Sequence, residues 1–529
     1  MLKQQTYLLS AASGILLSLP WMFPGQSWSL FFAFVPLMLA EHRLFGQQDK
    51  QLRAFFCPAL VTFLIWNVIS TWWIAYVSLA GMLLVIVLNA LLMAVVWTSR
   101  EFVRRQLGTA SSWLALFAFW LTFEFLHHRW AIPWPWLTLG NGFASSVKLI
   151  QWYEFTGVLG GSLWILLSNF FVFIVIRDLR SQASLKLLQS AGLAVGVIVF
   201  PISLSQYLYF SYSEKGMPLN VVVLQPNIDP YTEKFSGMST EEQVGRLVLL
   251  ARSKVDDSTD LILAPETALP PMWEDSLMMQ NKSLLLFSEI IKNHPKVRFV
   301  AGAITKRKSG AGEVISETAR RSADGSFYDV FNSALMIDRT SDVQISHKTI
   351  LVNGVERMPF QKYLGFLGEF VLHLGGTSGS LAAATEPVLF KGEGATKIGP
   401  IICFESVFGE YSGTLVKKGA DLLVVLTNDG WWKLSPGTWQ HFSYSRLRAV
   451  EIRRCIVRCA NTGVSGVINQ RGDVQMQSGT GTSEALSASV LMDDQITFYT
   501  IYGDFLGRIS AFLSGLIVLY WLGRRWNKW

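Results

Sequence analysis

Charge and cysteine are both scarce in this chain. Of its 529 residues, 16% are charged and 51% are hydrophobic, whereas about 25% of the residues of a soluble globular chain are charged. The composition excludes a wholly soluble protein and places much of the chain in lipid. Four cysteines are too few for a disulfide framework. Cys455 and Cys459 would lie roughly 13 Å apart along a strand, too far to bridge, so we expect both, and Cys57, to be packing residues.

The chain also lacks an internal repeat and a cluster of metal-ligating residues, so we expect no metal and no cofactor. A net charge of +7 could suggest nucleic acid as a partner. The placement of the basic residues argues against this, because they flank apolar segments, as the positive-inside rule expects of a membrane protein. We therefore expect no nucleic-acid partner.

Long apolar stretches recur along the chain. Most of them are close to the ~20 residues that a helix needs to cross the hydrocarbon of a bilayer, although the second and fifth are short. We predict seven spans within residues 1–212 and one more within residues 503–523. The stretches are Tyr7–Phe23, Ser27–Ala40, Phe55–Tyr76, Leu79–Trp97, Trp113–Leu126, Gly160–Ile176, Ala191–Phe210 and Phe505–Leu522.

Basic residues follow every second stretch and predict the orientation of the chain. Arg100, Arg104 and Arg105 follow the fourth stretch, and Arg524 and Arg525 lie near the end of the chain. Because basic loops remain in the cytoplasm, both termini are predicted to lie inside. The polar segment between the seventh and eighth stretches is then extracytoplasmic.

That polar segment, residues 218–495, has the pattern of a single α/β domain. A capping box at Ser239–Glu242 opens a helix with Val244, Leu247 and Val248 on one face, and a second, basic helix is expected at Arg446–Arg454. The predicted strands are Asn220–Leu224, Asp260–Leu263, Arg298–Ala301, Ser333–Ile337, Ile398–Cys403, Leu422–Leu426 and Gly463–Ile468.

Three residues at the ends of apolar runs carry the chemistry. Glu266 follows Leu-Ile-Leu-Ala-Pro, Lys348 follows Ile-Ser-His, and Cys403 ends Ile-Ile-Cys. Open α/β sheets bind ligands at the carboxyl ends of their strands. A base, a fixed cation and a soft nucleophile are the parts needed for acyl transfer through a thioester. A helix start after Cys403 would favour its thiolate. Taken singly, Cys403 could equally be a packed residue, Glu266 a turn residue and Lys348 a surface charge.

In combination the three residues are much more specific, because Glu, Lys and Cys in strand-end contexts are the arrangement of the nitrilase superfamily. With apolar spans on both sides, the chain resembles the apolipoprotein N-acyltransferase family over nearly its whole length. The resemblance implies an αββα sandwich attached to a multi-pass helical membrane domain. It rests on Pro265-Glu266, Lys348-x-x-Leu351-Val352, Glu356, Ile402-Cys403-Phe404-Glu405, Thr427-Asn428-Asp429-Gly430-Trp431, Gln440-His441, Arg446-x-Arg448-Ala449-x-Glu451 and Asn461-Thr462-Gly463.

The resemblance also implies roles. Glu266 would be the base, Cys403 the nucleophile and Lys348 the oxyanion partner, with Glu356 and Glu405 supporting them. The donor would be a phospholipid and the acceptor a diacylglyceryl lipoprotein, at the outer side of a bacterial inner membrane, in a monomer. The residues expected to line a lid or an acyl entrance are Phe235, where the family often has tryptophan, Phe360, Phe366, Trp431 and Trp432.

Two other functions remain open at this point. One is a membrane-tethered amidase of the nitrilase type, for which eight spans would serve only as an anchor. The other is a transporter whose polar segment is a binding domain. The first predicts turnover of a small amide without an acylated cysteine, and the second predicts that Cys403 is dispensable.

Overall fold

The chain divides into two compact units in a computed structural model. The helical unit comprises Met1–Tyr212 and Tyr502–Trp529, and the α/β unit comprises Ser213–Ile501. The structure describes residues 2–43, 52–180, 184–234, 237–310, 312–340, 342–358, 380–392 and 396–526. Each unit is described by itself.

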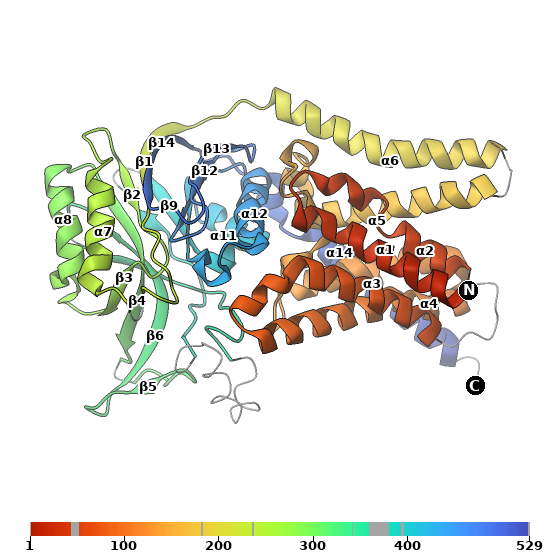
Figure 1. Cartoon of the computed structure of the whole chain (residues 1–529), viewed down its shortest axis with the longest axis horizontal. Helices are drawn as coiled ribbons and strands as arrows, with labels where there is room; N and C mark the ends of the chain where they lie inside the picture. The colour runs from red at the N-terminus through yellow and green to blue at the C-terminus, as the bar shows by residue number, and fades with distance from the viewer. Residues whose placement is uncertain are drawn as a thin grey trace. The chain divides into compact units, whose positions relative to one another are not determined.

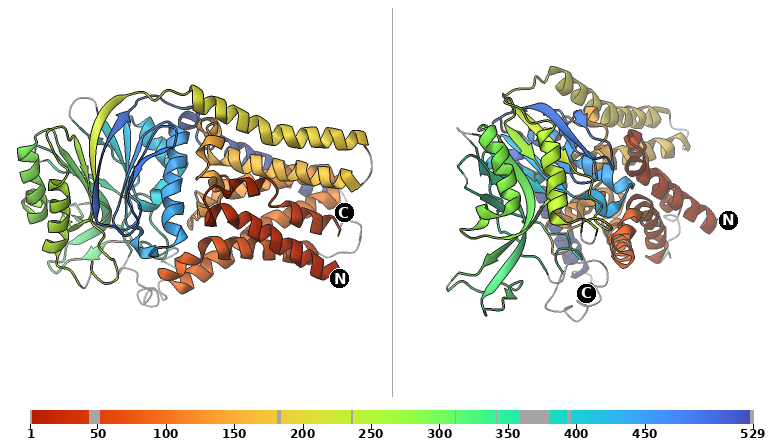
Figure 2. Two further views of the ribbon diagram at one scale, coloured as in Figure 1. Left: turned by 45° about the horizontal axis from the view of Figure 1, so that its top comes forward. Right: turned by 60° about the vertical axis from the view of Figure 1, so that its left-hand side comes forward.

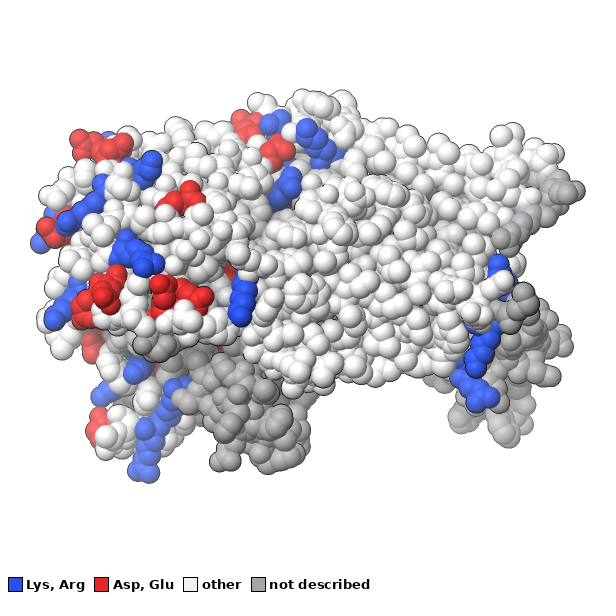
Figure 3. Space-filling model, in the orientation of Figure 1, with Lys and Arg blue, Asp and Glu red and all other residues white. Residues whose placement is uncertain are grey.

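The helical unit is built mainly from long helices, and short 3-10 helices lie between several of them (Figure 1). Within it α1 packs against α3, α3 against α4, and α5 against α6. On the face seen in Figure 3, almost no charged side chain lies along these helices, as expected of a surface that faces lipid. The helices are α1 (Leu2–Met22), α2 (Val35–His42), α3 (Arg53–Thr71), α4 (Leu79–His127), α5 (Tyr153–Arg180), α6 (Ser184–Ser211) and α14 (Phe505–Trp526).

The second predicted span is wrong as a continuous helix. Residues Gln26–Phe31 form a 3-10 helix, and α2 begins afresh with Pro36 in its first turn. Proline has no N–H to continue a preceding helix and is favoured at a helix start. With eight residues, α2 is only about 12 Å long, less than half of the hydrocarbon thickness.

Residues between the fourth and fifth predicted spans continue as helix. The change of direction within α4 comes at Gly108, whose φ of 86° and ψ of 176° are not helical. Arg104 lies on the helix before this break and pairs with Glu101 at 2.6 Å. The basic residues that we expected in a loop therefore lie on the helical turns before Gly108.

In the described part of the chain, five helices are long and apolar enough to cross a membrane: Arg53–Tyr76, Leu79–His127, Tyr153–Leu179, Ser184–Ser211 and Phe505–Arg524. The chain is accordingly that of a membrane protein. The number of eight spans and their sidedness stay predictions.

The α/β unit contains two sheets. One has the order β14-β1-β2-β4-β6-β5, with β3 also pairing β4 and β7 pairing β6, and the other has the order β13-β12-β11-β10-β9-β8. The strands of the first are β1 (Met217–Gln225), β2 (Leu261–Leu263), β3 (Leu269–Trp273), β4 (Arg298–Lys308), β5 (Arg320–Arg321), β6 (Phe327–Ile337), β7 (Gln344–His347) and β14 (Glu484–Met492). Those of the second are β8 (Phe390–Lys391), β9 (Lys397–Ile402), β10 (Leu422–Thr427), β11 (Ile456–Ala460), β12 (Gly466–Ile468) and β13 (Val474–Gln477).

Four layers result, because both faces of each sheet are apolar. In β1, Val221 and Val223 face the second sheet, while Val222 and Leu224 face the helices α7 and α8, as the two-residue period of a strand requires. The second sheet is covered in the same way by α11 and α12 (Figures 1 and 2). The helices are α7 (Thr240–Arg252), α8 (Lys282–Asn293), α11 (Gly409–Lys417), α12 (Pro436–Ile452) and α13 (Phe498–Tyr502).

Every strand predicted from the sequence corresponds to an observed one, and the capping box of α7 is present, with both the Ser239 and the Glu242 contacts. The predicted basic helix is different. It begins at Pro436, ends at Ile452, and buries Arg448. Arg448 pairs with Glu451 at 2.8 Å, which neutralises this buried charge.

Gly302 of β4 allows the chain to pass closely behind Glu266. A Cβ atom at this position would stand 2.6 Å from both the Cα of Glu266 and the backbone nitrogen of Thr267, a distance that side chains do not adopt. Both contacts are to backbone, which cannot swing aside. The glycine therefore fixes how the segment after β2 lies on the sheet.

We expect Gly302→Ala to destabilise the protein by about 1–3 kcal/mol, the usual result of overpacking. Thermal unfolding of the purified protein in detergent should show a lower transition temperature. The matched control is Gly245→Ala in α7, where no atom lies within 4 Å of the added Cβ. That change should raise stability by up to about 1 kcal/mol. Equal effects of the two changes would contradict the packing argument.

Candidate active site

Glu266 lies three residues beyond β2, in a turn that continues with Thr267 at a positive φ of 50°. The residue is 7% exposed. One carboxylate oxygen, Oε1, accepts a hydrogen bond from Asn332 Nδ2 at 2.7 Å and lies 3.4 Å from Lys348 Nζ. The other, Oε2, accepts one from the backbone N–H of Asn428 at 3.0 Å. The carboxylate is therefore held in one orientation.

Lys348 follows β7 and is 1% exposed. Its Nζ donates to Glu356 Oε1 at 2.9 Å as well as to Glu266. Burial disfavours the charged form of this lysine, but Glu356, Glu266 and Cys403 outweigh burial and raise the pKa of the ammonium group above its usual value. Lys348 is therefore a fixed cation.

Asn332 joins the two carboxylates. Its Nδ2 donates to Glu266 Oε1 at 2.7 Å and to Glu356 Oε1 at 2.8 Å, and its backbone carbonyl accepts from the N–H of Lys348 at 2.8 Å. Glu356 is fixed further by the N–H of Val352 at 2.8 Å. The sequence analysis missed Asn332, although a polar residue within the apolar run of β6 was a usable signal.

Cys403 stands directly after β9 with φ of 52°, a left-handed conformation that residues other than glycine adopt only under constraint. It is half-buried. Burial, and after it the negative charge of Glu266, raise the pKa of the Cys403 thiol, while Lys348 acts in the opposite direction. The helix start predicted after Cys403 is present as a 3-10 helix, Cys403–Val407, while burial and Glu266 act against the thiolate.

Glu405 supports the backbone on both sides of the site. Its Oε1 accepts from the N–H of Thr349 at 2.7 Å and its Oε2 from the N–H of Ile402 at 2.8 Å. Burial raises the pKa of Glu405, and these N–H groups oppose the rise. The Glu405 carboxylate therefore links Thr349, which follows Lys348, to Ile402, which precedes Cys403.

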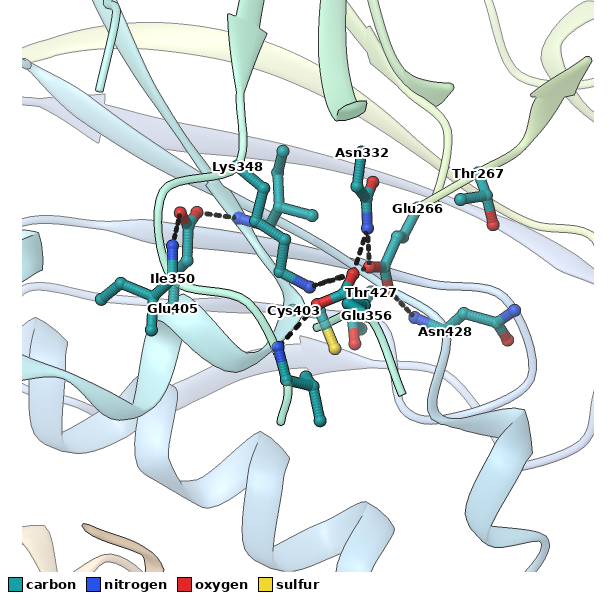
Figure 4. A network of polar contacts seen from close by, with 12 residues as sticks. Glu266, Thr267, Asn332, Lys348, Ile350, Glu356, Cys403, Glu405, Thr427 and Asn428 are labelled. Carbon is teal, nitrogen blue, oxygen red and sulfur yellow. Dashed lines mark hydrogen bonds and ion pairs between the residues drawn. The ribbon is translucent and has the colours of Figure 1, made fainter. Parts of the chain in front are cut away.

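Figure 4 shows Lys348, Glu266 and Glu356 ending beside Cys403, although they come from different segments. The structure therefore brings together all five of the polar residues predicted for the site, with Glu405 acting on the backbone. A second lysine, Lys234, reaches the same turn and donates from Nζ to Thr267 Oγ1 at 2.5 Å. Burial lowers the pKa of Lys234 to about 8, and Glu266 acts in the opposite direction.

Trp431 and Trp432 lie in a 3-10 turn, Asp429–Trp432, just after β10. Tyr231 packs edge-on against Trp431 and donates its hydroxyl to the carbonyl of that residue at 2.8 Å. Trp432 packs edge-on against His441. A role for them at an acyl entrance stays a prediction. Phe235, Phe360 and Phe366 lie outside the described residues.

The arrangement offers a base, a thiol and a permanent cation in one place. Where the structure describes the chain, no group of three or more His, Cys, Asp or Glu residues could hold a metal ion. The chemistry that these residues can perform on their own is nucleophilic attack by sulfur on a carbonyl carbon. The carboxylate can accept the thiol proton, and the ammonium group can stabilise the oxyanion.

Family models match two parts of the chain. Residues 13–171 match the family model of the apolipoprotein N-acyltransferase N-terminal domain, and residues 221–496 match that of carbon-nitrogen hydrolases. An amidase of the nitrilase superfamily from Nesterenkonia has a TM-score of 0.37 and 13% sequence identity, covering 56% of this chain and 97% of its own.

Curated relatives extend over both units. The apolipoprotein N-acyltransferase of Chlorobaculum tepidum is 28% identical, covering 98% of this chain and 97% of that protein. The enzyme of the same name from Geobacter metallireducens is 30% identical, covering 95% of this chain and 92% of that protein. The chain therefore belongs to the apolipoprotein N-acyltransferase family, with a catalytic unit of the carbon-nitrogen hydrolase type.

Proposed function

We propose that this protein transfers an acyl chain from a phospholipid to the N-terminal amine of a diacylglyceryl lipoprotein through a thioester on Cys403. The observation that carries the proposal is the contact set of Glu266, Lys348 and Glu356 beside Cys403. Lipoprotein N-acylation is supported by relatives named for that activity over nearly the full length of the chain.

In the first half-reaction Glu266 accepts the thiol proton as the sulfur attacks the ester carbonyl of the phospholipid. The raised pKa of the Cys403 thiol makes this proton transfer necessary near neutral pH, because little thiolate exists beforehand. Lys348 stabilises the oxyanion of the tetrahedral intermediate. When the intermediate collapses, Glu266 returns the proton to the departing alkoxide, which leaves as a lysophospholipid.

In the second half-reaction the neutral α-amine of the lipoprotein attacks the thioester carbonyl. Glu266 takes a proton from the amine, Lys348 again stabilises the oxyanion, and the amide forms as the carbon–sulfur bond breaks. The proton on Glu266 passes to the sulfur and restores the thiol. One base therefore serves both steps, and its hydrogen bonds to Asn332 and Asn428 hold it still.

Lipid substrates account for the apolar helices of a chain whose reactive residues all lie in the α/β unit. We place the protein in the inner membrane of a bacterium, as a monomer with several membrane-spanning helices. Its α/β unit then lies on the extracytoplasmic side, following the distribution of basic residues.

Purified protein incubated with phospholipid and no acceptor should gain the mass of one acyl chain at Cys403. Neutral hydroxylamine should release it, because thioesters are labile to this nucleophile. Cys403→Ala should abolish the adduct, whereas Cys57→Ala should not. Absence of an adduct together with turnover of a small amide would favour the tethered amidase. Full biological function of Cys403→Ala would favour a transporter.

Glu266→Gln should slow formation of the thioester at least about 100-fold, the lower range for loss of a general base. The same change removes a negative charge that raises the pKa of the Cys403 thiol. The pKa should fall, the thiolate fraction at pH 8 should rise, and alkylation of Cys403 by iodoacetamide should become faster. Opposite changes in the two rates distinguish a base from a residue needed for folding.

The matched control for this charge change is Glu386→Gln, whose carboxylate is exposed and pairs with Lys418. Neither rate should change in that variant. Acylation of Glu266→Gln at the normal rate would show that another group accepts the thiol proton.

A membrane-impermeant maleimide should label Asp257→Cys in cells whose outer membrane is permeabilised and whose inner membrane is intact. The side chain of Asp257 is 98% exposed in the α/β unit. Arg105→Cys, after the fourth predicted span, should be labelled only after the inner membrane is permeabilised. The reverse pattern would overturn the predicted sidedness.

A further inference from the structure

The backbone of Cys403 adopts a conformation that it would not choose by itself. Its φ is 52°, and a left-handed conformation is unfavourable for a residue other than glycine. Such a conformation persists only where the surroundings determine it. The groups that touch the backbone of this residue therefore matter for where its sulfur lies.

Two side chains hold the carbonyl oxygen of Cys403. Ser406 Oγ donates to it at 2.7 Å, and His441 Nε2 lies 3.2 Å from it. A carbonyl oxygen only accepts hydrogen bonds, so Nε2 carries the proton of the neutral imidazole in this contact, and Nδ1 accepts from Arg458 Nη2. Ser406 Oγ and His441 Nε2 are also 2.9 Å apart. Both residues are fully buried.

His441 is itself fixed by a buried ion pair. Its Nδ1 lies 2.9 Å from Asp429 Oδ1 and 2.8 Å from Arg458 Nη2, and Arg458 Nη2 donates to Asp429 Oδ2 at 2.8 Å. Burial disfavours the Asp429 carboxylate, but the positive charge of Arg458 acts against burial, and the pKa of Asp429 lies below its usual value. Burial, and after it the charge of Arg458, lower the pKa of His441.

Asp429 is also adjacent in sequence to a residue that hydrogen-bonds Glu266. Asp429 follows Asn428, whose backbone N–H donates to Glu266 Oε2 at 3.0 Å. Thr427 Oγ1 donates to Asp429 Oδ1 at 2.8 Å. A short segment after β10 therefore leads in one direction to Glu266 and in the other, through His441, to the carbonyl of Cys403.

We propose that Ser406, His441 and Asp429 form a positioning unit, a carbonyl clamp, which holds the nucleophile in its strained backbone conformation and in register with Glu266. These are positioning residues, because they act through the backbone of Cys403. The inference rests on the proposed function and adds three residues to the machinery of the first half-reaction.

A purely structural reading makes a different prediction. If the buried ion pair between Asp429 and Arg458 serves only to stabilise the fold, Ser406 matters little, because its removal leaves that pair intact. The clamp instead requires the hydroxyl of Ser406. Ser406→Ala therefore separates the two readings better than a change to the buried charges, which could prevent folding.

The experiment measures thioester formation on the full-length protein in detergent, at several phospholipid concentrations. Ser406→Ala should lower the maximal rate about 10-fold, with the half-saturating concentration and the unfolding temperature nearly unchanged. Ser406→Thr, which keeps the hydroxyl, should recover most of the rate, and Ser406→Val, of similar shape without it, should not. Ser412→Ala in α11, whose buried hydroxyl donates to the carbonyl of Phe408 and not to that of Cys403, is the matched control.

Alkylation of Cys403 by iodoacetamide across pH supplies a readout that needs no acyl transfer. In Ser406→Ala the thiol should move away from its buried place beside Glu266, so the midpoint of the pH profile should fall toward that of an ordinary cysteine. Ser406→Thr should keep the midpoint of the unaltered protein.

An unchanged midpoint and an unchanged maximal rate in Ser406→Ala would overturn the clamp. Equal rates for Ser406→Thr and Ser406→Val would do the same. If the unaltered protein forms no thioester while Ser406→Ala still shifts the alkylation midpoint, the proposed function fails and the clamp stands.

Discussion

The ammonium group of Lys348, buried between two carboxylates, is the constraint on which the site depends. Removing a charge from water costs several kcal/mol, and a partner must repay this. Glu356 at 2.9 Å and Glu266 at 3.4 Å are those partners. Because Glu356 is nearer and is also held by the N–H of Val352, Lys348 remains paired whatever Glu266 does. The cation can therefore stay in place while Glu266 gains and loses a proton.

Several residues with a strained backbone conformation lie around the site in the α/β unit. The described residues other than glycine with positive φ include Thr267 next to the base, Cys403 itself and Lys433 after the two tryptophans. Regular strands end just before Cys403 and three residues before Glu266, so the sheets supply rigid supports and the turns supply the special geometry. Strain of this kind is stored where a function requires an unusual side-chain direction. The apolar core between the sheets provides the stability that offsets it.

Much of this site could be predicted from the sequence, since strand ends are visible as apolar runs that stop. Glu266, Lys348 and Cys403 were found in this way, and the structure brings them together. Asn332 was missed because it precedes the predicted strand Ser333–Ile337, and only the three-dimensional pairing of β4, β6 and β7 shows that it bridges two carboxylates. The raised pKa of the Cys403 thiol could not be predicted, because local sequence shows the helix start but not the burial or the opposing charge.

Glu356 stays paired with Lys348 while Glu266 gains and loses a proton. This difference has a consequence for side reactions. In the proposed cycle, the Glu266 carboxylate carries the proton of the thiol to the departing alkoxide. Later it carries a second proton from the amine to the sulfur. No exchange with bulk solvent is needed at any stage. A site that transfers its protons internally can exclude water. The thioester on Cys403 then survives until an amine arrives and is not lost to hydrolysis.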